Sequence, residues 1–168
     1  MEEPRRGIRR LEIWIPVVVV ALDQVTKALV RAGLAVSETI AVVPGFMNLT
    51  HVRNTGAAFG MFNATDFPYK TLVLATIAFV GLVLIGFYAV QLPREQLWAR
   101  LGLALILGGA TGNLIDRLVE GSVVDFVDVY FGTWHFWAFN VADSAITVGV
   151  SVMLFDLIGI GTHVSKTV

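Results

Sequence analysis

Asp125 and Asp143 are the residues whose surroundings best suit acid–base chemistry. Asp125 stands in Val123-Val124-Asp125-Phe126, among apolar residues and without a basic residue close in sequence. Asp143 follows Asn140, which is placed to cap a helix, so Asp143 falls in the first helical turn. Two carboxylates brought together at the edge of hydrocarbon share a proton, so one can act as base and the other as acid. Aspartic proteases activate water in this way.

The residues leave a structural interpretation of these aspartates open. In the first turn of a helix, Asp143 would stabilise the helix dipole by about 0.3–1 kcal/mol without any catalytic role. Asp128, on the same segment as Asp125, is interpreted as a solvated loop residue. Sequence spacing alone does not bring Asp125 and Asp143 together, so the shared-proton hypothesis stands beside the structural one.

Three other ionisable residues in apolar segments are predicted to be structural. Asp23 and Lys27 stand four residues apart on one helical face, where each costs about 2.5–3.5 kcal/mol to insert unless it is paired. Asp116 has Arg117 as an adjacent countercharge. A carboxylate paired in this way stays ionised and exchanges no proton near neutral pH.

Other reaction chemistries find little support. Ser144 lacks the Gly-x-Ser-x-Gly pattern of a nucleophile elbow. The histidines, His51, His135 and His163, are scattered and form no ligand spacing typical of a metal site. The chain has no cysteine. The residues therefore offer no convincing set of metal ligands.

The composition indicates that a membrane surrounds the elements carrying these residues. The chain has 168 residues, of which 56% are hydrophobic and 15% charged, and its mean hydropathy is +0.75. Soluble domains are about 45–50% apolar and about 25% charged. The net charge of -1 provides no basic field for nucleic acid. A single domain is expected at this length.

Four segments are long enough to cross a hydrocarbon core of about 30 Å. They run over about 13–30, 71–90, 97–118 and 138–160. In the third, Ala104, Gly108 and Gly112 recur at every fourth position, a pattern typical of close helix contact. The predicted fold class is an all-α integral membrane protein with four transmembrane helices.

The distribution of basic residues predicts cytoplasmic termini. With the N-terminus inside, the cytoplasmic segments hold seven basic residues and the outside loops four. The inside set is Arg5, Arg6, Arg9, Arg10, Arg94, Arg100 and Lys166, and the outside set is Arg31, Arg53, Lys70 and Arg117. The positive-inside rule therefore places residues 37–61 and 118–138 outside.

Both outside segments have a composition of their own. Residues 37–61 combine β-branched residues with a Pro44-Gly45 turn, which predicts a short strand-rich segment. Residues 123–139 are rich in aromatic side chains, and Trp and Tyr favour the headgroup level. We expect this second segment to lie on the membrane surface.

Five sequence blocks, spread in order over nearly the whole chain, resemble the lipoprotein signal peptidases, also called signal peptidase II. The blocks are Asp23-Gln24-Val25-Thr26-Lys27, Asn54-Thr55-Gly56-Ala57-Ala58-Phe59, Gly112-Asn113-Leu114-Ile115-Asp116-Arg117, Val124-Asp125-Phe126 and Phe139-Asn140-Val141-Ala142-Asp143-Ser144. Each block is weak alone, whereas the five together make a specific match.

The resemblance implies a bacterial aspartyl endopeptidase of the cytoplasmic (inner) membrane. Such a hydrolase removes the signal peptide from diacylglyceryl-modified prolipoproteins, cleaving before the lipidated cysteine. It implies one peptidase domain over 1–168, an extracytoplasmic β-cradle at about 37–61, and a facing flap around Phe131–Phe136. The implied partners are the lipidated prolipoprotein, the phospholipid bilayer and cyclic peptide inhibitors such as globomycin. No cofactor is implied, and a monomer is expected.

The resemblance also implies roles for individual residues. Asp125 and Asp143 would form the catalytic pair near the outer leaflet surface, one deprotonating water and the other protonating or polarising the scissile carbonyl. Family positions that hold the substrate backbone or the site geometry match Asn54, Gly56, Asn113, Arg117, Asn140 and Ala142. Positions regarded as supporting structure match Asp23, Lys27 and Asp116.

Two other function classes compete with the peptidase. A small transporter or proton-coupled channel also collects intramembrane carboxylates, but it predicts charges near the bilayer centre and inverted repeats. The carboxylates here cluster toward one surface, and the four segments show no repeat. A non-catalytic anchoring subunit would give no reason for Asp125 and Asp143 to stand in apolar surroundings.

Overall fold

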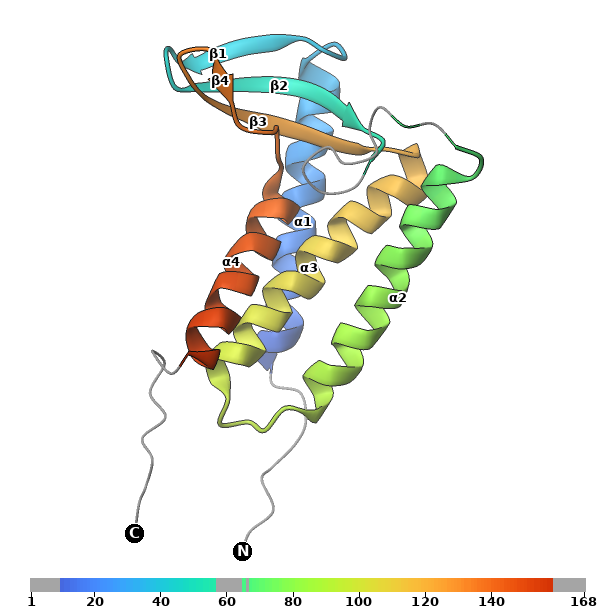
Figure 1. Ribbon diagram of the computed structural model, residues 1–168, viewed down its shortest axis with the longest axis vertical. Helices are drawn as coiled ribbons and strands as arrows, with labels where there is room; N and C mark the ends of the chain where they lie inside the picture. Colours follow the sequence, from blue (N-terminus) through green and yellow to red (C-terminus); the bar gives the residue numbers. More distant parts are fainter. Residues whose placement is uncertain (1–9, 57–64, 66, 159–168) are drawn as a thin grey trace, which may run out of the picture.

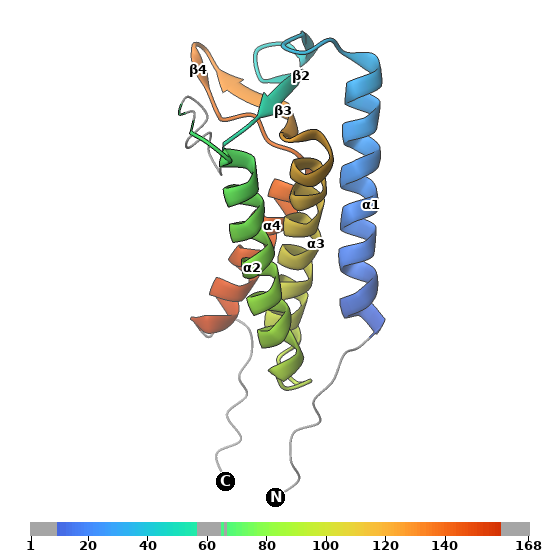
Figure 2. The same ribbon diagram turned by 90° about the vertical axis from the view of Figure 1, so that its right-hand side faces the viewer.

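The computed structural model describes residues 10–56, 65 and 67–158, which form four helices and four strands (Figure 1). The helices lie side by side, and the strands cover one end of the helical bundle (Figures 1 and 2). In chain order the elements are α1 (Arg10–Gly33), β1 (Thr39–Val43), β2 (Met47–Asn54), α2 (Lys70–Gln91), α3 (Leu97–Glu120), β3 (Val123–Phe131), β4 (Trp134–His135) and α4 (Val141–Leu157).

The most buried of the long helices is α3. In its most apolar stretch 61% of the residues are buried, against 22% for α1 and 6% for α2. Small residues allow the close approach, since a Cβ at Gly108 would lie 2.8 Å from Cβ of Val19 on α1. A Cβ at Gly102 would lie 2.7 Å from the carbonyl oxygen of Gly149 on α4. The close helix contact predicted for this segment is confirmed.

Within the described residues, α1, α2 and α3 are long and apolar enough to cross a membrane. The predicted segments 13–30, 71–90 and 97–118 each lie inside one of these helices. The fourth helix, α4, has 17 residues, and the last part of the predicted segment 138–160 lies outside the described residues. Helix α4 begins at Val141 because Asn140 caps it, accepting a hydrogen bond from the backbone N–H of Asp143.

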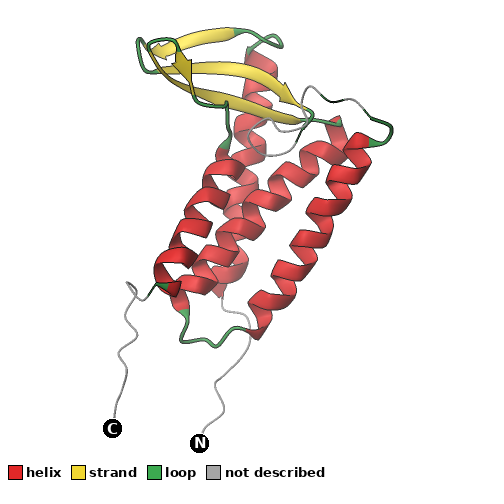
Figure 3. Ribbon diagram, in the orientation of Figure 1, coloured by secondary structure: helices red, strands yellow, loops and turns green. Residues whose placement is uncertain are grey.

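The strands form an antiparallel sheet with the order β1-β2-β3-β4 among the described residues (Figure 3). The β1–β2 hairpin turns at Pro44-Gly45, where Gly45 has a φ of 82°, a conformation that glycine adopts without strain. The strand-rich segment predicted at 37–61 is thus confirmed over its described part. Residues 57–61 lie outside the described residues.

The segment after α3 forms a strand, whereas the sequence predicts only a segment on the membrane surface there. Gly121, with a φ of 72°, ends that helix, and Val123–Phe131 then forms the nine-residue strand β3. Strand β4 pairs back onto β3, so Trp134 of the predicted flap segment belongs to the sheet. The β-branched and aromatic residues of this segment favour a strand when a neighbouring strand offers its edge, and β2 does so.

Asp128 was predicted to be a solvated loop residue, and the structure corrects this. It lies on β3, where its carboxylate accepts hydrogen bonds from Nδ2 of Asn48 at 2.9 Å and from Nδ1 of His135 at 2.9 Å. Its side chain is only 13% exposed. Asp128 therefore ties β3 to both β2 and β4.

Candidate active site

Asp125 is placed by the alternation of strand β3. Its neighbours Val124 and Phe126 share the opposite strand face and pack with Val30 and Leu34 near the end of α1. Asp125 itself is 3% exposed. Its Oδ1 accepts a hydrogen bond from Nδ2 of Asn140 at 2.7 Å, and its Oδ2 accepts one from Nδ2 of Asn54 at 2.9 Å. The polar face of β3 thus delivers one carboxylate to the end of the bundle.

Asp143 is placed by the first turn of α4. Its Oδ2 accepts from the backbone N–H of Asn140 at 3.2 Å, while Oδ1 of Asn140 accepts from the backbone N–H of Asp143 at 2.9 Å. This reciprocal capping box satisfies backbone donors at the helix start. The other carboxylate oxygen, Oδ1, accepts from Nδ2 of Asn113 at 2.7 Å. The predicted capping role of Asn140 is confirmed.

Both aspartates line one cavity of about 610 Å³. Residues from β2, α2, α3, β3 and α4 contribute to its wall, and most of the lining surface is apolar. The polar lining includes Asn54, Asn113, Arg117, Asp125 and Asp143. Asn140 joins the pair, because its side chain contacts Asp125 while its capping box holds Asp143.

Burial raises the pKa of Asp125 from 3.8 to about 7, and the negative charge of Asp143 acts in the same direction. The hydrogen bonds from Asn54 and Asn140 oppose this rise, because they stabilise the ionised carboxylate. Asp125 therefore exchanges a proton near neutral pH, as a general acid or base must. The arrangement can hold one proton on one carboxylate while its neighbour is ionised.

Arg117 and the loop after β2 form another part of the cavity wall. A guanidinium nitrogen of Arg117 donates to the carbonyl oxygen of Gly56 at 2.9 Å, and another donates to the carbonyl oxygen of Asn113 at 3.2 Å. The backbone N–H of Gly56 donates to Oδ1 of Asn54 at 2.9 Å, which leaves Nδ2 of Asn54 for Asp125. Arg117 thereby positions the end of β2, which carries Asn54, over the cavity.

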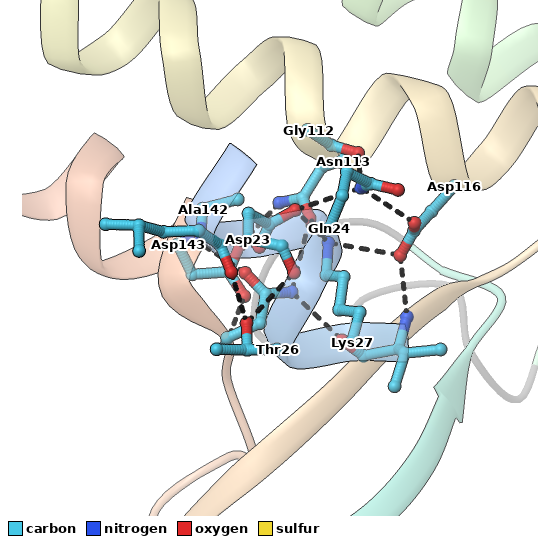
Figure 4. Close-up of polar contacts among 12 residues, drawn as sticks. Asp23, Gln24, Thr26, Lys27, Gly112, Asn113, Asp116, Ala142 and Asp143 are labelled. Atoms are coloured by element: carbon cyan, nitrogen blue, oxygen red, sulfur yellow. Dashed lines mark hydrogen bonds and ion pairs between the residues drawn. The ribbon is translucent and has the colours of Figure 1, made fainter. Parts of the chain in front are cut away.

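Behind the cavity lies a buried ionic cluster, which we define as Asp23, Lys27 and Asp116. Figure 4 shows Lys27 of α1 reaching toward Asp23, Asn113 and Asp116. The ammonium lies 2.8 Å from Oδ2 of Asp23 and 3.1 Å from Oδ2 of Asp116. The predicted Asp23–Lys27 pair is confirmed, with both side chains 0% exposed.

The predicted partner of Asp116 is wrong. Its carboxylate pairs with Lys27 and lies 3.7 Å from a nitrogen of Arg31, whereas the hydrogen bonds of Arg117 go to Gly56 and Asn113. Adjacent residues on a helix point about 100° apart, so sequence neighbours do not face one another. The countercharge comes instead from the neighbouring helix α1.

The ionic cluster connects directly to the elements that carry the two aspartates. Oδ1 of Asp23 accepts the backbone N–H of Ala142 at 2.9 Å, in the first turn of α4. Oδ2 of Asp116 accepts the backbone N–H of Val124 at 3.1 Å, next to Asp125. These bonds fix the start of α4 and the start of β3 to the same buried charges.

Some residues of the site were not singled out from the sequence. Gln24 donates to Oδ2 of Asp23 at 3.2 Å, to Oδ1 of Asp116 at 3.1 Å and to the carbonyl oxygen of Gly112 at 3.1 Å. An amide side chain inside an apolar span indicates a buried hydrogen-bonding role, so the sequence does contain a signal for Gln24. Trp137, which had no predicted role beyond membrane anchoring, lines the cavity beside Phe136 of the predicted flap segment.

All the residues assigned from the resemblance lie at or directly behind the cavity. Asn54, Asn113, Arg117, Asp125 and Asp143 line it, while Gly56, Asn140 and Ala142 hold those residues in place through the bonds above. Among the described residues, no group of three His, Asp or Glu side chains has the arrangement of a metal site.

The three long apolar helices indicate a membrane protein, and comparisons with known proteins specify its family. The family model described as Signal peptidase (SPase) II matches residues 15–159. The lipoprotein signal peptidase of Syntrophotalea carbinolica is 44% identical over 86% of this chain and 89% of its own. That of Pseudomonas paraeruginosa is 42% identical over 94% of this chain and 93% of its own.

A solved structure described as a bacterial membrane enzyme superposes on this chain with a TM-score of 0.84. It is 30% identical in sequence, and the match covers 99% of each chain. A second one, described in the same words, has a TM-score of 0.80. The chain belongs to the signal peptidase II family.

Proposed function

We propose that this chain is a membrane aspartyl endopeptidase that removes the signal peptide from diacylglyceryl-modified prolipoproteins, cleaving before the lipidated cysteine. The observation that carries the proposal is the joint position of Asp125 and Asp143 in one cavity, with Asn140 bonded to both. Family membership supports the substrate class. The chemistry of two carboxylates sharing a proton supports the aspartic type.

In the proposed reaction Asp125 carries the shared proton and Asp143 is ionised. Asp143 takes a proton from a water molecule, and the water oxygen attacks the scissile carbonyl carbon. Asp125 gives its proton to the carbonyl oxygen, which forms a neutral tetrahedral intermediate. When the intermediate collapses, the C–N bond breaks, the hydroxyl proton returns to Asp125, and the proton on Asp143 passes to the leaving amine.

Substrate binding is assigned to the rest of the cavity wall. Asn54 and Arg117 offer polar groups to a peptide backbone beside the aspartates. Apolar residues such as Ala78 of α2 and Ile146 and Val148 of α4 line the same cavity, so it suits a peptide that carries acyl chains. Cyclic peptide antibiotics such as globomycin would compete for this space.

The topology belongs to the same proposal. We assign all four helices as membrane spans, with both termini cytoplasmic and the sheet outside as a cradle at the membrane surface. The four arginines before or at the start of α1 support this orientation through the positive-inside rule. Asp125 and Asp143 would then act near the outer leaflet of the bacterial inner membrane, in a monomer.

The test is cleavage of a diacylglyceryl-modified prolipoprotein in detergent or lipid by the parent, Asp125→Asn and Asp143→Asn. Asp128→Asn is the matched control, because Asp128 lies on the same strand as Asp125 but bonds to Asn48 and His135. We expect the two pair variants to lose at least about 10³-fold in kcat and the control to keep parental activity.

A substrate without the diacylglyceryl group tests the lipid requirement in the same assay. A parent enzyme that leaves the lipidated substrate intact would overturn the peptidase assignment. Folded Asp125→Asn or Asp143→Asn variants that still cleave would move the chemistry away from this pair.

A further inference from the structure

Lys27 is a buried cation whose ammonium contacts more than its ion-pair partners. Besides Asp23 and Asp116, it donates to Oδ1 of Asn113 at 2.9 Å. An ammonium has three N–H donors, and these contacts use all three. Asn113 in turn donates to Asp143 at 2.7 Å. One amide therefore separates the buried cation from the aspartate pair.

The contact with Lys27 determines which way the Asn113 amide faces. Oδ1 of Asn113 accepts from Lys27 and, at 3.2 Å, from Nδ2 of Asn140, which leaves Nδ2 to donate to Asp143. If the amide were rotated by 180°, its NH₂ would face the ammonium and its oxygen would face the carboxylate. Both contacts would then be repulsive, so the ammonium enforces the donor orientation toward Asp143.

The charge of Lys27 also acts where water is excluded, because the side chains of Lys27 and Asp23 are 0% exposed. Coulomb interactions are much stronger there than in water. Burial and the charge of Asp143 raise the pKa of Asp125, and the charge of Lys27 acts in the opposite direction. The other charged groups facing the pair or the ammonium are Asp23 of α1 and Asp116 and Arg117 of α3, and Arg31 of α1 faces Asp116.

We propose that Lys27 is a positioning residue for the reaction and not only a structural ion-pair partner. Its ammonium holds Asn113 in the orientation that donates to Asp143, and its charge lets the aspartate pair lose one of its two protons near neutral pH. This inference rests on the peptidase function proposed above. By this inference, a residue that does not line the cavity brings the pair to its reactive, singly protonated state.

The test compares the pH profiles of kcat and kcat/KM for parent, Lys27→Met and Lys27→Arg on the lipidated prolipoprotein. Arg100→Met is the control for destabilisation, because it breaks another buried ion pair, with Glu12, on the α1–α3 interface. In Lys27→Met we expect the acidic and the basic limb of the pH profile to shift to higher pH by about one unit. We also expect kcat to fall about 10–100-fold. KM should change less than about threefold, and Lys27→Arg should keep the parental limbs.

Asp23→Asn/Lys27→Gln covers the case in which Lys27→Met does not fold. It removes one charge of each sign and keeps an acceptor for the backbone N–H of Ala142. We expect a smaller upward movement of the limbs than in Lys27→Met, because loss of the negative charge of Asp23 offsets part of the loss of the Lys27 charge. The inference is overturned if the folded variants show the parental pH profile and lose no more activity than Arg100→Met. An inert parent, or active Asp125→Asn, would instead count against the peptidase proposal itself.

Discussion

Nδ2 of Asn140 lies 2.7 Å from Oδ1 of Asp125, although the two residues are 15 positions apart and belong to different elements. The same Asn140 caps α4 and holds Asp143 in its first turn. One amide thus couples a helix cap to the geometry of the two carboxylates. Changes at this position should affect stability and chemistry separately, according to which function the new side chain retains.

Asn140→Ser should keep the cap and lose the contact with Asp125, because serine is a good N-cap but its hydroxyl is too short to reach β3. We expect cleavage to fall about 10–100-fold through loss of orientation, with little change in the unfolding temperature. Asn140→Ala should show the same loss and a further destabilisation of about 1 kcal/mol. Equal stabilities for the two variants would contradict the capping role.

Activity should fall as the pH rises above about 7, because Asp125 is proposed to act in its protonated form and its pKa is raised to about 7. A profile of kcat/KM against pH on the lipidated substrate measures this limb. Above the pKa the rate should drop about tenfold for each pH unit. An activity that instead rises through neutral pH to a plateau would exchange the roles of Asp125 and Asp143.

The stability of the folded protein should depend on the same titration. Between pH 3.8 and about 7, Asp125 is protonated in the folded state and ionised in the unfolded chain. The folded state binds more protons in this range, so the free energy of unfolding falls as the pH rises and is constant above it. Asp125→Asn lacks this titration and should gain stability relative to the parent, by up to about 4 kcal/mol at about pH 8.

Thermal unfolding of the parent, Asp125→Asn and Asp128→Asn at several pH values measures this difference. The gap between Asp125→Asn and the parent should widen from acid to neutral pH, whereas Asp128→Asn should follow the parent. A constant gap across the range would show that Asp125 has an ordinary proton affinity.

Asp116→Ala should destabilise the protein by about 1–3 kcal/mol, because the buried ammonium of Lys27 loses one of its two carboxylate partners. The backbone N–H of Val124 would lose its acceptor as well. The matched control is Glu120→Ala, which breaks an ion pair with Arg53 at the surface. The side chain of Glu120 is 34% exposed and that of Arg53 is 45% exposed. That change should cost about 0–1 kcal/mol. Denaturation in detergent, followed by circular dichroism, measures the free energy of unfolding of both variants. Similar losses of stability would contradict the structural role assigned to Asp116.

Gly109→Ala should destabilise the α3–α4 contact, because a Cβ there would collide with the carbonyl oxygen of Ala142 and lie 2.8 Å from the side chain of Ile146. Overpacking of this kind costs about 1–3 kcal/mol. It should also slow cleavage, since Ala142 belongs to the helix turn that carries Asp143.

Gly81→Ala on α2 is the control, because nothing lies within 4 Å of its Cβ position. It should be neutral or stabilising by up to about 1 kcal/mol. A Gly109→Ala variant as stable as Gly81→Ala would refute the close packing.

Local patterns were sufficient for the helices and for the residue types of the site. Apolar runs of about 20 residues predicted α1, α2 and α3, because hydrocarbon admits only segments whose backbone groups bond internally. The i, i+4 spacing of Asp23 and Lys27 predicted their ion pair, since both lie on one helix face. The position of Asn140 predicted the cap of α4 in the same way.

Contacts between distant segments decided the rest. Strand β3 exists because β2 offers it an edge, and no pattern within Val123–Phe131 reveals that partner. Asp116 pairs with Lys27 on another helix and not with its neighbour Arg117, because side-chain direction on a helix decides which charges meet. The sequence by itself determined which side chains are available for chemistry and that a membrane surrounds them. Only the tertiary structure decided that Asp125 and Asp143 share one cavity, because that meeting depends on how a strand and a helix are held by the same buried charges.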